Sequence, residues 1–281
     1  MTSDIPQADI ERRFGGLSRL YGNAGAKHIR GAHVVVVGIG GVGSWAAEAL
    51  ARSGVARLTL IDLDHIAESN INRQIHALDD TFGQAKVQAM RERIGHINHA
   101  CEVLCVEEFV DETNWPAIAN FESSKFSSLS VIDACDQVKA KTAMAAWSLQ
   151  QTVKTKSRTV NFISVGAAGG KRHAHKVEIE DLSLTTHDPL LAQLRYRLRK
   201  NHGASRTGKM AVSCVFSRES VLSPGATWST ADAPASALES SRQDSSLNCH
   251  GYGSVVSVTA TFGMCAAGWV LDKISLTDSK Q

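Results

Sequence analysis

Apolar positions in the first part of the chain fall into short continuous runs separated by longer mixed stretches. The first run, residues 32–38 (AHVVVVG), is dominated by β-branched side chains and ends in glycine, a pattern typical of a strand buried on both faces in a parallel sheet. Similar runs predict strands at residues 57–62, 102–106, 129–133 and 159–165, with helices between them at residues 45–52, 86–94 and 139–152. This alternation predicts an α/β fold with a Rossmann-like, doubly wound, mostly parallel sheet over about residues 30–166.

The pattern weakens in the C-terminal part. Two more strands and a helix are predicted at residues 176–179, 212–217 and 189–202. Residues 218–250 are rich in Ser, Ala and Pro, lack an apolar period, and are predicted to form a long mobile loop. No repeat or clear linker divides the chain, so we expect a single domain over residues 1–281, with a core at about 30–166 and a C-terminal elaboration at 167–281.

One segment, residues 252–271 (YGSVVSVTATFGMCAAGWVL), carries no charge and is about as long as a bilayer-spanning helix. Its Gly, Ser and Thr residues dilute its hydrophobicity. We therefore expect a Gly- and Ala-rich helix buried inside the domain, with membrane contact as the alternative.

Composition adds few constraints. Hydrophobic residues make up 43% and charged residues 21% of the chain, and the formal net charge is +2, which does not by itself indicate a polyanionic partner. The start, MTSDIPQADIERRF, is polar and favours a cytoplasmic protein without a secretory signal. The six cysteines include no CxxC pair and are expected to be free thiols, although Cys101 and Cys105 leave a zinc site as an alternative.

The clearest motif, Gly38-x-Gly40-Gly41-x-Gly43, lies between the first predicted strand and the following helix. Glycines there permit a tight turn and a close approach of backbone amides to phosphate oxygens. Asp62, at the end of the second strand, stands where an acid can bind ribose hydroxyls. The motif leaves open whether the ligand is NAD or ATP, and a tight turn without a ligand is the simpler alternative.

A second set of polar residues favours ATP. Behind Asp62 the chain carries Asp64, Asn70, Asn72, Arg73, Gln74 and Lys86. A triphosphate presents charge that Arg73 and Lys86 can neutralise, whereas hydride transfer has no evident need for both cations. A solvated polar loop is the alternative for any one of these residues.

A third motif, Asp133-x-x-Asp136, follows the strand at residues 129–133. Carboxylates at the C-terminal end of a parallel strand lie on the ligand-binding edge of the sheet, where Asp136 is the better candidate to hold Mg²⁺. Helix capping is the alternative role for this residue.

The motifs GIGGVGS, DLDHIAESNINRQIH, GQAK and VIDACD, in this order, resemble the ubiquitin-activating-enzyme-like, or ThiF-type, superfamily, which includes bacterial adenylyltransferases that activate sulfur-carrier proteins. The ordered match covers about residues 10–140. The resemblance implies that ATP and Mg²⁺ are bound by Gly41, Asp62, Arg73, Lys86 and Asp136, with support from Asn70 and Gln74.

The same resemblance implies that Arg13, in RRFGG, reaches the phosphates bound by the partner subunit of a homodimer. Gln137 is a departure, because the adenylyltransferases usually carry Asn there. The full candidate nucleotide-binding set is Gly38, Gly40, Gly41, Gly43, Asp62, Asp64, Asn70, Asn72, Arg73, Gln74, Lys86 and Asp136. Of the candidate residues, Arg13, Arg73, Lys86 and Asp136 are predicted to be catalytic.

Within the superfamily, RFGGLSRLYG, DPLLAQLRYRLRKNHG, KMAVSCVFSRES and SVTATFG resemble one branch, the tRNA threonylcarbamoyladenosine dehydratase family. This resemblance implies ATP-dependent adenylation of the threonyl carboxylate of a modified adenosine next to the anticodon, followed by an intramolecular attack that closes a ring. It also implies tRNA as substrate and sulfur-relay proteins, a cysteine desulfurase or sulfur acceptor, as further partners.

A basic stretch fits a tRNA substrate. The candidate phosphate contacts are Arg195, Arg197, Arg199, Lys200, Arg206 and Lys209, although a charged run is commonly just a solvated face. Cys214 and Cys249 are alternative thiol nucleophiles, but a buried core cysteine is commoner and adenylation needs no enzyme thioester.

Three other functions stay open from the sequence. An adenylyltransferase for a small carrier protein ending in Gly-Gly is disfavoured by the missing zinc cysteines, and a non-catalytic scaffold by the intact Arg73, Lys86 and Asp136. An NAD-dependent dehydrogenase is the third.

Overall fold

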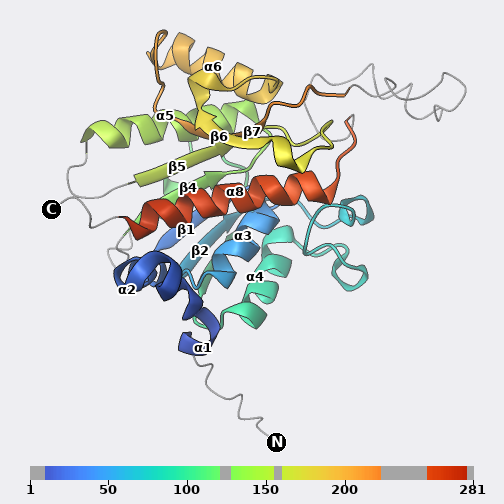
Figure 1. Cartoon of the computed structure of the whole chain (residues 1–281). Coiled ribbons are helices and arrows are strands. Elements are labelled where there is room, and N and C mark those ends of the chain that lie inside the picture. The colour runs from blue at the N-terminus through green and yellow to red at the C-terminus, as the bar shows by residue number, and fades with distance from the viewer. Residues whose placement is uncertain (1–9, 121–127, 155–159, 223–251, 277–281) are drawn as a thin grey trace, which may run out of the picture.

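The computed structural model describes residues 10–120, 128–154, 160–222 and 252–276. A seven-stranded sheet in the order β3-β2-β1-β4-β5-β7-β6 forms its centre (Figure 1). Its strands are β1 (His33–Val37), β2 (Arg57–Ile61), β3 (Glu102–Val106), β4 (Leu129–Asp133), β5 (Val160–Val165), β6 (Val177–Asp181) and β7 (Ser213–Ser217). All neighbours are parallel except β6, which runs antiparallel to β7. The predicted Rossmann-like α/β fold is confirmed.

The valine run of β1 is buried on both faces because the sheet has a hydrophobic core on each side. Val34 and Val36 lie in one core, and Val35 and Val37 in the other. Successive side chains of a strand point to opposite faces, so a strand at the centre of two cores has to be apolar throughout.

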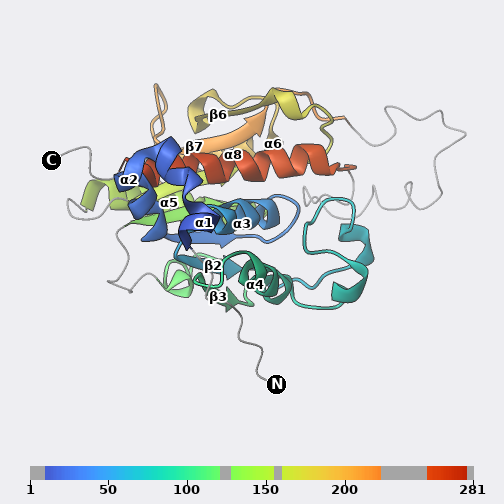
Figure 2. The ribbon, with the colours of Figure 1, turned by 60° about the horizontal axis from the view of Figure 1, so that its bottom comes forward.

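Helices cover both faces of the sheet (Figures 1 and 2). One face carries α2 (Gly16–Arg30), α3 (Gly43–Arg52), α4 (Lys86–Ile97) and α8 (Val256–Ser275), and the other carries α5 (Val138–Lys154) and α6 (Pro189–Asn201). A short helix, α1 (Ile10–Phe14), precedes α2 at the N-terminal end. The predicted helices are present, and several are longer than the sequence pattern indicated.

The uncharged C-terminal segment is the buried helix expected from the sequence. Val258, Phe262, Ala266 and Val270 of α8 recur at every fourth position and are fully buried. At Gly263 a Cβ atom would collide with the Val42 carbonyl oxygen, so the missing side chain lets α8 lie directly against α3. Among the described helices, none is long and apolar enough to cross a membrane.

The sheet joins strands from both predicted parts of the chain, since β6 and β7 extend the order begun by β1 to β5. Most of the predicted loop at 218–250 lies outside the described residues. The division of the chain into one domain stays a prediction.

Candidate functional site

The C-terminal ends of β1, β2, β4 and β5 meet at one edge of the sheet. Because the strand order places β1 between β2 and β4, the connections run in opposite directions from β1, and ligands of doubly wound folds bind in the crevice at such a point. A cavity of about 500 Å³ lies there, within the size range of ligand-binding clefts.

The loop after β1 has no room for a side chain at Gly38 or Gly43. Gly38 adopts a positive φ of 85°, and a Cβ atom there would lie 2.8 Å from the Ala134 carbonyl oxygen at the end of β4. A Cβ atom at Gly43 would collide with the Gly38 carbonyl oxygen. Gly38, Gly40 and Gly41 line the cavity, whereas Gly43 lies outside the lining and permits the close packing of the loop on α3.

Asp62 ties this loop to the end of β2. Its Oδ2 accepts a hydrogen bond from the Ile39 amide at 2.6 Å, and its Oδ1 accepts one from the Asp64 amide at 2.9 Å. Burial raises the pKa of the Asp62 carboxyl, while Lys86 and the two amides oppose the rise. The carboxylate oxygens retain acceptor capacity for a ligand hydroxyl.

Two cations lie on the β2 side of the cavity. The Lys86 ammonium is 2.7 Å from the Asp64 carboxylate, and the side chain is almost fully buried at the first turn of α4. Arg73 packs against Gly41 and donates from Nη1 to the Ser69 carbonyl at 2.7 Å and to Asn72 Oδ1 at 2.9 Å. Both side chains line the cavity, so the positive charge predicted from the sequence is brought together at one place.

Gln74 supplies a polar group that is poised for a ligand. It lines the cavity and is only 5% exposed, and its Oε1 has no hydrogen-bond partner among the described residues. A buried polar atom without a partner costs free energy, and a bound ligand that donates a hydrogen bond removes that cost.

The asparagines nearby are used by the protein itself. Asn70 lines the cavity and accepts a hydrogen bond from the Ala67 amide at 3.1 Å, which stabilises the short turn Glu68–Asn70. Asn72 donates to the Ser254 carbonyl at 3.0 Å and lies outside the cavity lining. It thereby joins the loop after β2 to the chain that enters α8.

Asp136 and Asp133 have different environments. Asp136 is exposed and lines the cavity, so its carboxylate is available to a cation. Asp133 is fully buried. No group of three or more His, Cys, Asp or Glu side chains that could hold a metal occurs among the described residues.

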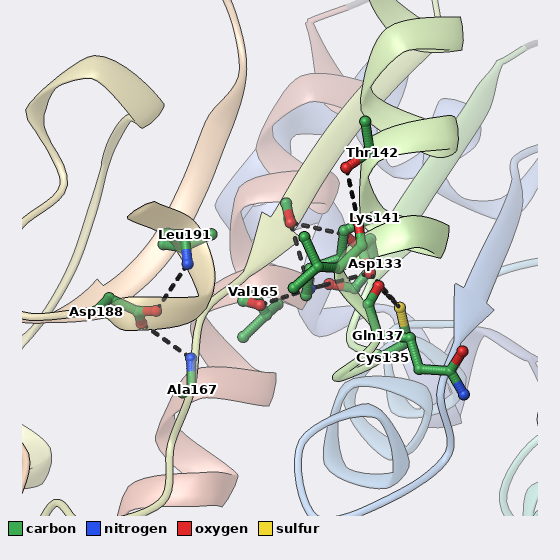
Figure 3. Close-up of polar contacts among 11 residues, drawn as sticks. Asp133, Cys135, Gln137, Lys141, Thr142, Val165, Ala167, Asp188 and Leu191 are labelled. Carbon is green, nitrogen blue, oxygen red and sulfur yellow. Dashed lines mark hydrogen bonds and ion pairs between the residues drawn. The ribbon is translucent and has the colours of Figure 1, made fainter. Parts of the chain in front are cut away.

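The sequence pattern missed a buried charge beneath the cavity. The Lys141 ammonium lies 3.1 Å from Asp133 Oδ1 and donates to the Val165 carbonyl at 2.7 Å (Figure 3). Ser164 donates to Asp133 Oδ2 at 2.6 Å. Burial lowers the pKa of Lys141, but the Asp133 carboxylate together with Cys135 and Cys214 outweighs burial, so that pKa is raised. The helix sequence KAKTAM gave no sign that this lysine is buried.

Described cysteines are poor nucleophiles. Cys214, an alternative thiol nucleophile, is fully buried in β7, and burial raises the pKa of its thiol well above the usual value. Burial raises the pKa of Cys101 to about 12 and that of Cys105 to about 11. Cys249 lies outside the described residues.

Arg13 lies away from this cavity, in a surface pocket beside α1 and α4. Its Nη1 donates to the Ile97 carbonyl at 2.7 Å. The predicted role of Arg13 in a partner subunit concerns a second copy, so it stays a prediction.

In the basic stretch on and after α6, some side chains bond to the protein's own backbone and others are exposed. Arg195 donates from Nη1 to the carbonyls of Leu182 and Thr185, both at 3.0 Å, and so holds the preceding turn in place. Arg199 donates to the Ser205 carbonyl at 3.1 Å, and the Lys200 ammonium lies 5.6 Å from the Tyr196 ring centre. Arg206 and Lys209 are exposed, and Arg197 is partly exposed.

Two further walls of the cavity were not predicted from the sequence. Residues 108–110 contribute after β3, and a second, uncharged wall is formed by residues 166–169, Pro189, Leu190, Val221 and Tyr252. No motif marks either segment, because each residue reaches the cavity through the tertiary fold.

The glycine loop, the acid at the end of β2 and the cations beside them define a Rossmann-like nucleotide-binding protein. The ThiF family model matches residues 15–281, and the chain belongs to the ThiF family.

Two curated relatives are tRNA threonylcarbamoyladenosine dehydratases. The protein from Escherichia coli (strain K12) is 40% identical over 272 residues, which cover 96% of each chain. The one from Haemophilus influenzae is 39% identical over 269 residues, which cover 95% of this chain and 94% of the relative. The solved structure of the E. coli dehydratase TcdA in complex with ATP has a TM-score of 0.78 and 39% identity, covering 96% of this chain and 97% of that one. Its AMP complex also has a TM-score of 0.78, at 37% identity and the same coverage.

Proposed function

We infer that this protein is an ATP-dependent tRNA threonylcarbamoyladenosine dehydratase. The observation that carries the inference is the 40% identity to the E. coli dehydratase over nearly the full length of both chains. The cavity supports it, because ten of the twelve candidate nucleotide-binding residues line one space at the edge of the sheet.

ATP is proposed to lie along the glycine loop. The loop amides approach the phosphates at the start of α3, Asp62 accepts from the ribose hydroxyls, and Gln74 Oε1 gains a partner. Arg73 and Lys86 neutralise phosphate charge. The solved complexes of the E. coli relative with ATP and with AMP support ATP as the nucleotide.

Asp136 is proposed to hold Mg²⁺, since its carboxylate lines the cavity and is exposed. When bound, the ion polarises phosphate oxygens and so favours the departure of pyrophosphate. The protein's own residues position the reacting groups and stabilise charge with Arg73 and Lys86.

The proposed reaction proceeds in two steps. A carboxylate oxygen of the substrate bonds to the α-phosphorus of ATP while the bond to pyrophosphate breaks. A neighbouring nucleophile of the same substrate attacks the acyl carbon, its proton goes to solvent, and AMP leaves with the former carboxylate oxygen. The nucleoside has lost one water, and both steps use one cavity, which supplies the advantage of orientation.

tRNA phosphates are proposed to contact the exposed cations after and at the end of α6, chiefly Lys200, Arg206 and Lys209. Arg195 is the least suited of the predicted set because its guanidinium is already committed to backbone carbonyls. A cytoplasmic location stays part of the proposal.

A homodimer in which Arg13 reaches the partner's nucleotide stays part of the proposal. Sulfur-relay partners remain a prediction from the resemblance alone. Sulfur transfer through a thiol of this chain has no support in the described part of the chain, where burial raises the pKa of all five cysteines.

The test is incubation of the purified protein with ATP, Mg²⁺ and tRNA that carries threonylcarbamoyladenosine, followed by nucleoside mass spectrometry under mild conditions. The expected result is an ATP-dependent loss of one water from that nucleoside. An unchanged nucleoside, together with carrier-dependent exchange of pyrophosphate into ATP, would replace the proposal with adenylation of a small carrier protein.

A further inference from the structure

The cavity extends beyond the residues assigned to ATP. One of its other walls consists of residues 166–169, Pro189, Leu190, Val221 and Tyr252, and none of these side chains is charged. We call it the uncharged wall. It lies on the β5 side of the glycine loop, opposite Asp62 and Lys86, because β4 and β5 follow β1 in the sheet order.

Buried charged groups fix the loop at the base of the uncharged wall. On one side of Gly166, the Val165 carbonyl accepts from Lys141 at 2.7 Å, and on the other the Ala167 amide donates to Asp188 at 2.9 Å (Figure 3). Asp188 also caps α6 by accepting from the Leu191 amide at 3.0 Å. Asp188 therefore connects the loop after β5 to the start of α6.

The backbone next to Tyr252 is hydrogen-bonded to the same loop. Gly170 donates to the Gly253 carbonyl and accepts from the Leu222 amide, both at 2.9 Å. A Cβ atom at Gly169 would lie 3.5 Å from the Cβ of Tyr252, so the backbone of the loop and the tyrosine are in contact range. Tyr252 is half-buried and lines the cavity.

Two backbone amides of the loop belong to residues that line the cavity. The amides of Ala168 and Gly169 donate no hydrogen bond to any residue in the described part of the chain. Successive amides of a loop form a cradle for an anion such as a carboxylate. The uncharged wall thus combines an aromatic ring, an apolar surface at Leu190 and donors for a carboxylate.

We propose that the uncharged wall is the subsite for the modified nucleoside. The purine packs against Tyr252 and Leu190, and the carboxylate of the threonyl group lies toward the amides of Ala168 and Gly169. The proposal rests on the proposed function. Aromatic side chains bind unstacked bases of RNA through their flat faces, without needing a charge.

The course of α6 agrees with this assignment. The helix starts at the uncharged wall with Pro189 and Leu190, and its thirteen residues span about 20 Å toward the basic residues at its other end. A nucleotide seated on the wall would have the neighbouring tRNA backbone within reach of Lys200 and Arg206.

The experiment measures steady-state dehydration of threonylcarbamoyladenosine-bearing tRNA by Tyr252→Leu and Tyr252→Phe, with equilibrium ATP binding measured without tRNA. Tyr252→Leu is expected to raise the KM for tRNA about tenfold, since one stacked base contributes that much. Tyr252→Phe keeps the ring and should stay near the wild type, and the Kd for ATP should not change in either variant. Tyr21→Leu, which removes a tyrosine from α2, is the matched control.

If the wild-type enzyme forms product and Tyr252→Leu has an unchanged KM for tRNA, the subsite is overturned. The proposed dehydratase function is then unaffected. Wild-type enzyme without product would overturn both. A measurement that needs no variant uses the free modified nucleoside as inhibitor: competition with tRNA at fixed ATP is expected, whereas competition with ATP, or no inhibition at millimolar nucleoside, would overturn the subsite.

Discussion

Lys141 joins the ends of two neighbouring strands beneath the cavity. Its ammonium lies 3.1 Å from the carboxylate of Asp133, the last residue of β4, and 2.7 Å from the carbonyl of Val165, the last residue of β5. The side chains of Lys141 and Asp133 are both fully buried. Each charge is therefore stabilised by the opposite charge of the other side chain and not by water.

Replacement of Lys141 should therefore be costly. Lys141→Met leaves the Asp133 carboxylate buried without its cation, and we expect the free energy of unfolding to fall by about 3–5 kcal/mol. Denaturant unfolding followed by circular dichroism measures this. The double variant Lys141→Met/Asp133→Asn removes both charges and should recover part of the loss. A single variant as stable as the wild type would show that the pair does not stabilise the fold.

Asp136→Asn should impair catalysis more than folding. The exposed carboxylate contributes little to stability, but loss of the proposed Mg²⁺ ligand is expected to lower the rate of AMP formation about 100-fold or more. Single-turnover assays at increasing Mg²⁺ measure the effect. Asp79→Asn, at another exposed acid, is the control and should be unaffected. Unchanged AMP formation in Asp136→Asn would remove this residue from the site.

His76 makes stability depend on pH. Burial first, and then the charge of Lys86, lower the pKa of its ring to about 4, while an unfolded histidine titrates near 6.5. Between these values the unfolded chain binds a proton that the folded chain does not, so stability falls as pH drops from 6.5 toward 4. The full difference corresponds to roughly 3 kcal/mol.

The measurement compares the free energies of unfolding at pH 7 and pH 4.5. His76→Gln cannot titrate and should lose less stability over that interval than the wild type. Identical pH dependence in the two proteins would show that another group is responsible.

The basic residues on and after α6 should separate into two classes. Arg206→Ala and Lys209→Ala are expected to weaken tRNA binding and to reduce the slope of log K against log salt by about 1 each, with unchanged melting temperatures. Arg195→Ala should lower the melting temperature, because its guanidinium bonds to Leu182 and Thr185. Filter binding at several salt concentrations and thermal denaturation distinguish them, and the reverse pattern would contradict the assignment.

The sequence predicted most of the sheet because its strands are buried on both faces and so appear as uninterrupted apolar runs, as in residues 33–37. It also predicted the nucleotide half of the cavity, since glycines and charged residues follow strand ends at recognisable spacings. Lys141 and Asp188 could not be found in this way. A lysine among helical residues is ordinarily solvated, and the burial of both depends on elements distant in the chain.

The uncharged wall escaped prediction for a related reason. Its members come from four separate segments, and alanine, glycine, leucine and valine are common everywhere in a fold. Only Tyr252 is chemically distinctive, and the sequence around it predicts the start of a buried helix.

The hydrogen bonds of Gly170 to both Leu222 and Gly253 have a consequence for how this chain tolerates change. Leu222 and Gly253 are both hydrogen-bonded to Gly170. These bonds fix the neighbouring residues Val221 and Tyr252, which line the cavity, whatever the number of residues that connect them. A change in the length of the connecting sequence, or a foreign sequence grafted in its place, is therefore expected to leave Val221 and Tyr252 on their side of the cavity.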